Sequence, residues 1–273
     1  MEHNISHFSL IEIKRQASNA SKLEALYALP GIYGMEECEF SVKFYFLGED
    51  SKECQSFIKK TKELDLAIEN TRVPPKNWNE VWESAFQPVA VGNKWYIRAP
   101  FHQSKEGFDH EIIIAPKMAF GTGHHATTFM MLEVMADMVL KEKKVLDLGC
   151  GSGILSIAAE KKGAASILAV DYDPLSVENT IENLKINNGT KIAVSQIDVE
   201  SFDKKGFDLV LANINKNVLM ENLYKIEHLV NPGGSLIISG VMTADAEEIN
   251  KKISRFTNSI IFQKSNWICI HFY

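Results

Sequence analysis

The stretch VLDLGCGSGILSIAA, residues 145–159, decides the fold of this chain. An apolar run ends in three alternating glycines, Gly149, Gly151 and Gly153, and a helical pattern of apolar residues begins directly after them. Glycines at the end of a buried strand let the backbone approach a ligand closely at the edge of a parallel sheet. The dinucleotide fingerprint G-x-G-x-x-G does not fit, because its last glycine would fall on Ile154, and no lysine follows as a P-loop requires. The stretch therefore predicts a ligand-binding turn between a strand and a helix, and it argues against a pyrophosphate ligand.

Strand and helix patterns alternate along the second half of the chain. Strands are expected at residues 144–148, 166–171, 191–197, 207–213 and, after a turn at 232–234, 235–239. Helices are expected at residues 154–162, 174–187 and 220–230. Repeated strand–helix units predict a parallel sheet with right-handed crossovers. The last fifteen residues, SIIFQKSNWICIHFY, instead predict two strands joined by a tight turn at 264–266. We therefore expect an α/β fold with a mostly parallel seven-stranded sheet and an antiparallel edge.

Asp171 ends the strand that follows the glycine turn, 22 residues after Gly149. A carboxylate at that position can accept hydrogen bonds from both hydroxyls of a ribose. The pattern D-x-G-x-G-x-G with this acidic residue resembles motif I of the Rossmann-like class I S-adenosylmethionine-dependent methyltransferases. The plainer alternative is a glycine-rich turn with a capping aspartate. In that class the residue at Asp147 helps to place the methionine part of the cofactor, and a structural role at the strand end is the alternative.

Two polar residues end the next two expected strands. Asp198 lies where the methyltransferase fold often places adenine, so it is a candidate acceptor for the adenine amino group; a solvated loop aspartate fits equally well. Asn213 ends the fourth strand, where nitrogen-methylating members often carry [DN]-P-P-[YF], and this chain has NINK. An amide oxygen there can hold an amine so that its lone pair faces the reacting methyl group. The missing prolines and aromatic residue favour an aliphatic amine, and a strand-end cap is the alternative interpretation of Asn213.

The sequence singles out no catalytic base. An amine must be neutral to attack, whereas a free lysine amine has a pKa of about 10.4 and an α-amine one of about 8. Desolvation beside a sulfonium cation lowers the pKa of the amine. We therefore expect the proton of the amine to leave to water.

Longer stretches resemble one family, the ribosomal protein L-eleven methyltransferases, or PrmA family. The resemblance is carried by AFGTGHHATT (119–128), LDLGCGSGILSIAAEKKGAASILAVDYDP (146–174), LANI (211–214), NPGGSLIISG (231–240) and Trp267. NWNEVWESAFQPV (77–89) is similar to the family's linker, and LPGIYGMEECE (29–39) to its small domain. The resemblance implies methyl transfer from S-adenosylmethionine to the α-amine and lysine ε-amines of a basic large-subunit ribosomal protein. It also implies cofactor contacts at Thr128, Gly149, Asp171 and Asn213.

The stretch AFGTGHHATT departs from the family's AFGTG-T-H-P-T-T at His124 and Ala126. Adjacent side chains on an extended chain point to opposite faces, and no cysteine offers a nearby ligand, so we expect no metal site. Thr128, near the N-terminus of the following helix, is expected to offer a hydroxyl where the helix dipole favours the methionine carboxylate. His125 keeps the family's position and is expected to shape the loop or the substrate entrance.

The strongest break in the chain is TRVPPKNWNEVW, 71–82, because consecutive prolines interrupt regular structure and favour an extended linker. We expect a small domain at 1–70, a linker leading into the next domain at 71–107, and the methyltransferase domain at 108–273. In the small domain, strands at 6–14, 39–47 and 65–68 and helices at 21–29 and 51–64 predict a ferredoxin-like α+β fold. Its 8 basic and 12 acidic residues give a net charge of −4, which suits a basic substrate; a solvated surface is the alternative.

The composition of the chain limits the kinds of partner that it can be expected to bind. Its net charge of −6 over 273 residues provides no global basic field, so we expect no direct nucleic-acid partner. No uncharged apolar run approaches a membrane span, and MEHNISHFSL lacks the regions of a secretory signal, so we expect a cytoplasmic protein without a membrane partner. Its four separated cysteines are expected to stay reduced, and the chain is expected to be a monomer.

Two other functions compete with methylation of a ribosomal protein. A related protein-lysine or small-amine methyltransferase would share the motifs, but the acidic small domain argues against an enzyme for small molecules alone. A non-catalytic cofactor-binding module is the other alternative. The intact glycines, together with Asp171 and Asn213, argue against it.

Overall fold

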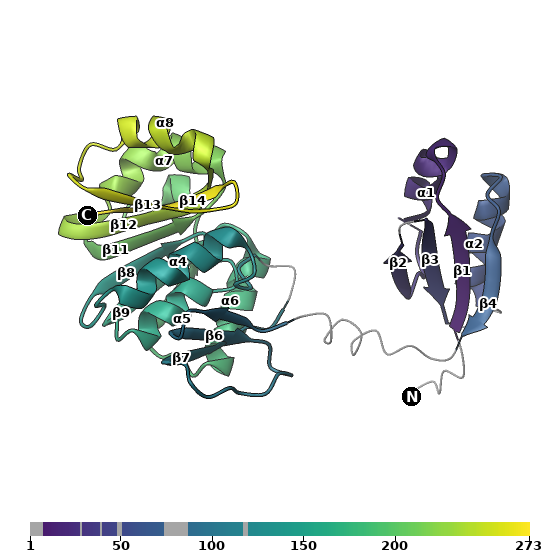
Figure 1. Ribbon diagram of the computed structural model, residues 1–273, viewed down its shortest axis with the longest axis horizontal. Helices are drawn as coiled ribbons and strands as arrows, with labels where there is room; N and C mark the ends of the chain where they lie inside the picture. Colours follow the sequence, from purple (N-terminus) through teal and green to yellow (C-terminus); the bar gives the residue numbers. More distant parts are fainter. Residues whose placement is uncertain (1–7, 28, 39, 48–50, 74–86, 117–119) are drawn as a thin grey trace. The chain divides into compact units, whose positions relative to one another are not determined.

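The computed structural model describes residues 8–27, 29–38, 40–47, 51–73, 87–116 and 120–273. The chain divides into two compact units, Met1–Ala85 and Phe86–Tyr273, and each is described by itself (Figure 1).

The smaller unit is a four-stranded antiparallel sheet with two helices on one face. Its elements are β1 (Phe8–Lys14), α1 (Ala20–Tyr27), β2 (Gly34–Glu37), β3 (Ser41–Phe46), α2 (Lys52–Glu63) and β4 (Glu69–Val73). The strands lie in the order β2-β3-β1-β4, and every pair is antiparallel. One core joins Ile11 and Phe44 of the sheet with Leu26 of α1 and Phe57 of α2, so both helices cover the same face. This arrangement confirms the ferredoxin-like α+β fold.

The prediction of a strand at residues 65–68 of the smaller unit is wrong. After α2 the backbone turns at Asp65, whose φ is 52°, and the N–H of Leu66 donates to the carbonyl of Thr61 over 3.0 Å. The last strand therefore begins only at Glu69. The sequence of β4, ENTRV, is exposed along most of its length and has no apolar alternation to mark it. The short strand β2, GMEE, was not predicted for the same reason.

A seven-stranded sheet forms the centre of the larger unit. Its strands are β8 (Lys144–Leu148), β9 (Ser166–Asp171), β10 (Ile192–Gln196), β11 (Phe207–Asn213), β12 (Val230–Met242), β13 (Ser259–Lys264) and β14 (Trp267–Phe272). They lie in the order β10-β9-β8-β11-β12-β14-β13. Neighbouring strands in the run β10-β9-β8-β11-β12 are parallel. In contrast, β14 runs antiparallel to both of its neighbours, β12 and β13. The expected mostly parallel sheet with an antiparallel edge is confirmed.

Helices cover both faces of this sheet (Figure 1). They are α4 (Ala126–Asp137), α5 (Ile154–Lys161), α6 (Pro174–Ile186), α7 (Lys216–Glu227) and α8 (Ala246–Lys252). Val145 of β8 belongs to a core shared with α4 and α5, whereas the next residue, Leu146, belongs to a core shared with α7 and α8. Alternate residues of a strand point to opposite faces, so one strand serves both layers. None of the helices in the described part of the chain is long and apolar enough to cross a bilayer.

The bounds of most elements agree with the expectations, with two differences. α7 begins at Lys216 rather than at residue 220, because the side-chain oxygen of Asn215 accepts the N–H of Val218 over 3.1 Å and caps the helix. The turn expected at residues 232–234 lies inside β12, where the pairing with β11 changes register between Phe207 and Leu209. The chain bulges there and the strand continues.

A three-stranded sheet precedes β8 and belongs to the larger unit. It contains β5 (Val89–Val91), β6 (Trp95–Arg98) and β7 (His110–Ile113). The fully buried Trp95 donates its indole N–H to the carbonyl of Leu132 in α4 over 2.9 Å. Val91 and Ile97 enter the same core as α4 and α5. The later part of residues 71–107 therefore packs as part of the larger unit.

Replacing Trp95 with alanine should lower the free energy of unfolding of the larger unit by about 3–5 kcal/mol, the usual cost of removing a buried tryptophan. Denaturant unfolding followed by circular dichroism measures this loss. Tyr224→Ala is the control, because Tyr224 on α7 is 71% exposed and its loss should cost less than about 1 kcal/mol. Equal losses in the two variants would show that β6 is not anchored in this core.

Candidate functional site

A pocket of about 400 Å³ opens where β8, β9 and β11 end at the carboxyl edge of the seven-stranded sheet. It is lined by Phe120, His125, Thr127, Gly149, Gly151, Asp171, Tyr172, Asp173, Ser176, Asn213, Ile214, Asn215, Gly240 and Trp267. Parallel α/β sheets bind their ligands at this edge. Four residues selected from the sequence, two glycines with Asp171 and Asn213, therefore meet around one pocket.

The glycine turn after β8 has no room for side chains. Gly149, Gly151 and Gly153 all have positive φ, at 70°, 55° and 78°. A Cβ on Gly151 would lie 2.5 Å from the carbonyl oxygen of Phe120, and one on Gly153 would lie 2.8 Å from Cγ2 of Thr180. Gly149 and Gly151 line the pocket, whereas Gly153 is the N-cap of α5 and packs against α6. The turn therefore combines two glycines at the pocket with a third that permits close packing behind it.

Asp171 is held rigidly at the end of β9. One carboxylate oxygen accepts the N–H of Gly151 over 2.9 Å, and the other accepts the N–H of Asp173 over 3.1 Å. The residue is 7% exposed and lines the pocket. Each oxygen has a second lone pair, so the carboxylate can still accept two hydroxyl groups from a ligand.

Asp147 is buried in β8, outside the residues that line the pocket. Its Oδ2 accepts the hydroxyl of Ser156 over 2.6 Å, and its Oδ1 has no hydrogen-bond partner among the described residues. Burial raises the pKa of this carboxyl to about 6, with a smaller contribution from the charge of Asp171. A buried carboxylate with an unpaired oxygen stabilises a nearby cation, because a positive charge offsets the cost of its desolvation.

Asn213, at the end of β11, presents one free oxygen. Its Nδ2 donates to Oγ1 of Thr128 over 3.2 Å, and its buried Oδ1 has no partner in the part of the chain that the structure describes. Thr128 is itself fully buried and does not line the pocket; the neighbouring Thr127 does. The hydroxyl expected to face the cofactor thus faces Asn213, and an amide acceptor lies in the pocket wall.

Asp198 does not line this pocket. It is exposed and caps the short 3-10 helix Val199–Ser201, with its Oδ1 accepting the N–H of Glu200 over 3.1 Å. Its contact with adenine stays a prediction.

Three rings from separate segments form an aromatic wall of the pocket, composed of Phe120, His125 and Trp267. The ring centroids of His125 and Trp267 are 4.9 Å apart, and those of Phe120 and His125 are 5.1 Å apart, both in edge-to-face geometry. Sequence reasoning did not place Phe120, Tyr172, Ser176 or the ring of Trp267 at the site. Tyr172 and Ser176 could have been found, because Tyr172 directly follows Asp171 and Ser176 lies in the first turn of α6.

The adjacent histidines lie in different surroundings. His124 is exposed, with its ring nitrogens 3.1 Å from Oγ1 of Thr122 and 2.8 Å from the carbonyl oxygen of Gln87. Among the described residues, no group of three or more His, Cys, Asp or Glu side chains is placed to hold a metal ion.

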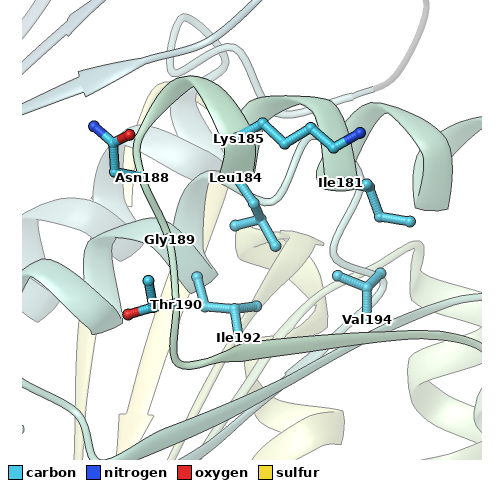
Figure 2. A pocket seen from close by; sticks show the side chains of 8 residues that line it. All are labelled: Ile181, Leu184, Lys185, Asn188, Gly189, Thr190, Ile192 and Val194. Carbon is cyan, nitrogen blue, oxygen red and sulfur yellow. The ribbon is translucent and has the colours of Figure 1, made fainter.

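A second pocket, of about 440 Å³, lies between α6 and β10. Ile181 and Leu184 project from the helix toward Ile192 and Val194 of the strand (Figure 2). Neither the glycine turn nor Asp171 nor Asn213 lines it. We therefore assign the functional site to the first pocket.

The sheet order, the glycine turn after β8 and the acidic residue at the end of β9 define a class I methyltransferase. The profile of one family, described as "Ribosomal protein L11 methyltransferase (PrmA)", matches residues 11–273. The chain belongs to this family.

Individual relatives agree with this membership. A Bacteroides fragilis protein named ribosomal protein L11 methyltransferase is 39% identical over 201 residues, 72% of each chain. A Phocaeicola vulgatus protein of the same name is 34% identical over 265 residues, 93% of this chain and 94% of its own. The crystal structure of a ribosomal protein L11 methylase from Lactobacillus delbrueckii subsp. bulgaricus superposes with a TM-score of 0.63 at 27% identity, covering 69% of this chain and 98% of that one.

Gly151→Ala should lower the free energy of unfolding of the larger unit by about 2–5 kcal/mol, because positive φ is unfavourable and the added Cβ collides with the Phe120 carbonyl. Gly233→Ala is the matched control. Gly233 also has positive φ, at 74°, but no atom lies within 4 Å of the added Cβ, so the loss should be only about 1–2 kcal/mol. Denaturant unfolding of both variants measures the difference. Equal losses would show that the space at Gly151 is not limiting.

Proposed function

We propose that this chain transfers methyl groups from S-adenosylmethionine to the α-amino and lysine ε-amino groups of a ribosomal protein of the L11 type. The names of its relatives supply the substrate class. The observation that carries the proposal is the free, buried Oδ1 of Asn213 in a pocket that also contains the glycine turn. A pocket wall that offers a hydrogen-bond acceptor at the strand end suits an amine, which brings N–H donors.

The residues of the pocket fit the cofactor. Gly149 and Gly151 permit close backbone approach, and Asp171 has free lone pairs for two ribose hydroxyls. The unpaired Oδ1 of the buried Asp147 favours a positive charge near the turn, as the methionine ammonium and the sulfonium provide. When bound, S-adenosylmethionine supplies a methyl group on a positively charged sulfur.

Asn213 aligns the amine in this proposal. Its Oδ1 accepts one N–H of the amine, while Thr128 holds its Nδ2, so the amide plane is fixed before the substrate arrives. Fixed geometry contributes to the rate because the reacting lone pair must face the methyl group in line. The amine loses its proton to water, since no carboxylate or histidine of the pocket is assigned as the base.

The smaller unit holds the protein substrate in this proposal, and residues 71–107 lead into the methyltransferase domain. Residues 1–70 carry a net charge of −4, which attracts a basic ribosomal protein. The enzyme acts as a monomer in the cytoplasm, without contacts to nucleic acid or a membrane. These features complete the proposal.

Incubation with methyl-labelled S-adenosylmethionine and ribosomal proteins, followed by intact-mass analysis, tests the proposed activity. We expect label in one large-subunit protein, in increments of whole methyl groups. A parallel incubation with free amines and unrelated basic proteins is the control. Comparable labelling of free amines would favour the small-amine alternative, and binding of the cofactor without any transfer would favour the non-catalytic module.

Asp171→Ala should weaken cofactor binding at least tenfold, because each charge-assisted hydrogen bond contributes about 1.5–3 kcal/mol. Isothermal calorimetry measures the dissociation constant. Asp208→Ala is the control, since the Asp208 carboxylate also accepts a backbone N–H, that of Lys144, but at the opposite edge of the sheet. Unchanged affinity in Asp171→Ala would rule out the ribose-binding role.

Asn213→Ala should lower kcat by about 10- to 100-fold, because loss of the amide lets the amine move out of line. The dissociation constant of the cofactor should change less than kcat. Steady-state kinetics on a protein or peptide amine, with calorimetry alongside, gives both values. Asn231→Ala, which removes an amide bound to Asp208 far from the pocket, should leave kcat unchanged. Full activity of Asn213→Ala would contradict its role in aligning the amine.

A further inference from the structure

His125 is the one histidine among the described residues that line the pocket, and its hydrogen bonds indicate which ring nitrogen carries the proton. It is the N-cap residue of α4, with φ −68° and ψ 139°, and its side chain accepts the N–H of Thr127. The distance from Nδ1 is 3.4 Å to that nitrogen and 2.8 Å to Oγ1 of Thr127. Nδ1 therefore faces a backbone N–H, which can only donate, and a hydroxyl, which can donate or accept. Because the backbone N–H can only donate, this contact requires the lone pair of Nδ1.

A proton on Nδ1 would be unfavourable, because it would set two N–H groups against each other at the N-cap and leave a helix N–H without an acceptor. The neutral ring therefore carries its proton on Nε2, an atom without a hydrogen-bond partner in the described part of the chain.

We propose that His125 is a positioning residue: its Nδ1 caps α4, which fixes the ring as the neutral Nε2–H tautomer, and the ring in turn holds the aromatic wall at the pocket. The proposed cap and the edge-to-face contacts with Phe120 and Trp267 use the same ring in one orientation. His125 thereby links three segments: the loop at Phe120, the start of α4 and the start of β14.

The consequence for catalysis rests on the proposed function. A histidine whose Nε2 carries the proton and whose Nδ1 accepts a helix N–H has no free lone pair for the proton of the amine. His125 presents an N–H to the pocket, so it orients a hydrogen-bond acceptor and does not act as the base. The proton of the amine therefore leaves to another acceptor, which is water in the proposed function.

Long-range proton–nitrogen NMR of the whole chain without cofactor tests the tautomer directly. We expect the neutral His125 ring to show an unprotonated Nδ1 and a protonated Nε2. A neutral ring that carries its proton on Nδ1 would overturn the proposal. This readout does not depend on methyl transfer, so it stands even where the proposed function fails.

Two substitutions separate the cap from the ring. His125→Asn and His125→Ala both remove the aromatic contacts, but asparagine restores an N-cap acceptor. The Tm of His125→Asn should therefore exceed that of His125→Ala by about 2–4 °C, the shift expected for one cap in a unit of this size. The same pair at His124, which is exposed and caps no helix, should show no such difference. Equal Tm values for the two His125 variants would overturn the proposed cap.

The pH dependence of kcat separates positioning from base catalysis. Removing a general base typically costs about 10²- to 10⁴-fold in rate, and it removes the inflection that a histidine base imposes between pH 5 and 8. We expect His125→Asn to retain the wild-type shape of the pH profile. Loss of the inflection together with a fall in kcat of that size would show that His125 takes the proton.

Discussion

Close approach of backbone to backbone at the turn after β8 is the constraint on which the site depends. Gly151 leaves room for the carbonyl of Phe120, and its own N–H binds Asp171. Ser152 donates two hydrogen bonds in the same place: its N–H donates to the Phe120 carbonyl over 2.9 Å, and its hydroxyl donates to the Gly121 carbonyl over 2.6 Å. Any Cβ at Gly151 would separate these segments. The turn thus joins β8, β9 and the loop before α4 into one rigid rim.

Asn183 of α6 and Asn187, the C-cap of this helix, extend the rim to the end of β7. The amide of Asn183 donates to the carbonyl of Ser152 and accepts the N–H of Ala115, both over 2.9 Å. One turn later, Asn187 accepts from and donates to the backbone of Ile113. Because a side-chain amide has both donors and an acceptor, it can satisfy buried backbone groups of two segments at once. The glycine turn and the end of β7 are therefore held in register by the same helix.

Local sequence patterns predicted the larger fold well where burial is continuous. β8, β9 and β11 have the predicted bounds because each is an apolar run between polar or glycine residues. The weaker predictions concern elements whose pattern is polar. The last strand of the smaller unit was predicted at 65–68, whereas β4 begins at Glu69. The start of α7 was predicted four residues too late, because the polar residues Lys216 and Asn217 give its first turn no apolar pattern. Propensity and periodicity report burial, so an exposed strand or a polar first turn gives little signal.

The sequence by itself determined the strand ends of the site. Gly149 and Gly151 lie in the turn after β8, whereas Asp171 and Asn213 end β9 and β11. Parallel strands bring their carboxyl ends to one edge, so the meeting of these residues at one pocket follows from order along the chain. Tertiary structure decided the rest. Trp267 reaches the pocket because β14 is inserted antiparallel beside β12, and Thr127 rather than Thr128 faces the pocket because helix geometry directs adjacent side chains about 100° apart. Which face of a helix meets a cavity depends on packing between segments distant in sequence, and no local pattern contains that information.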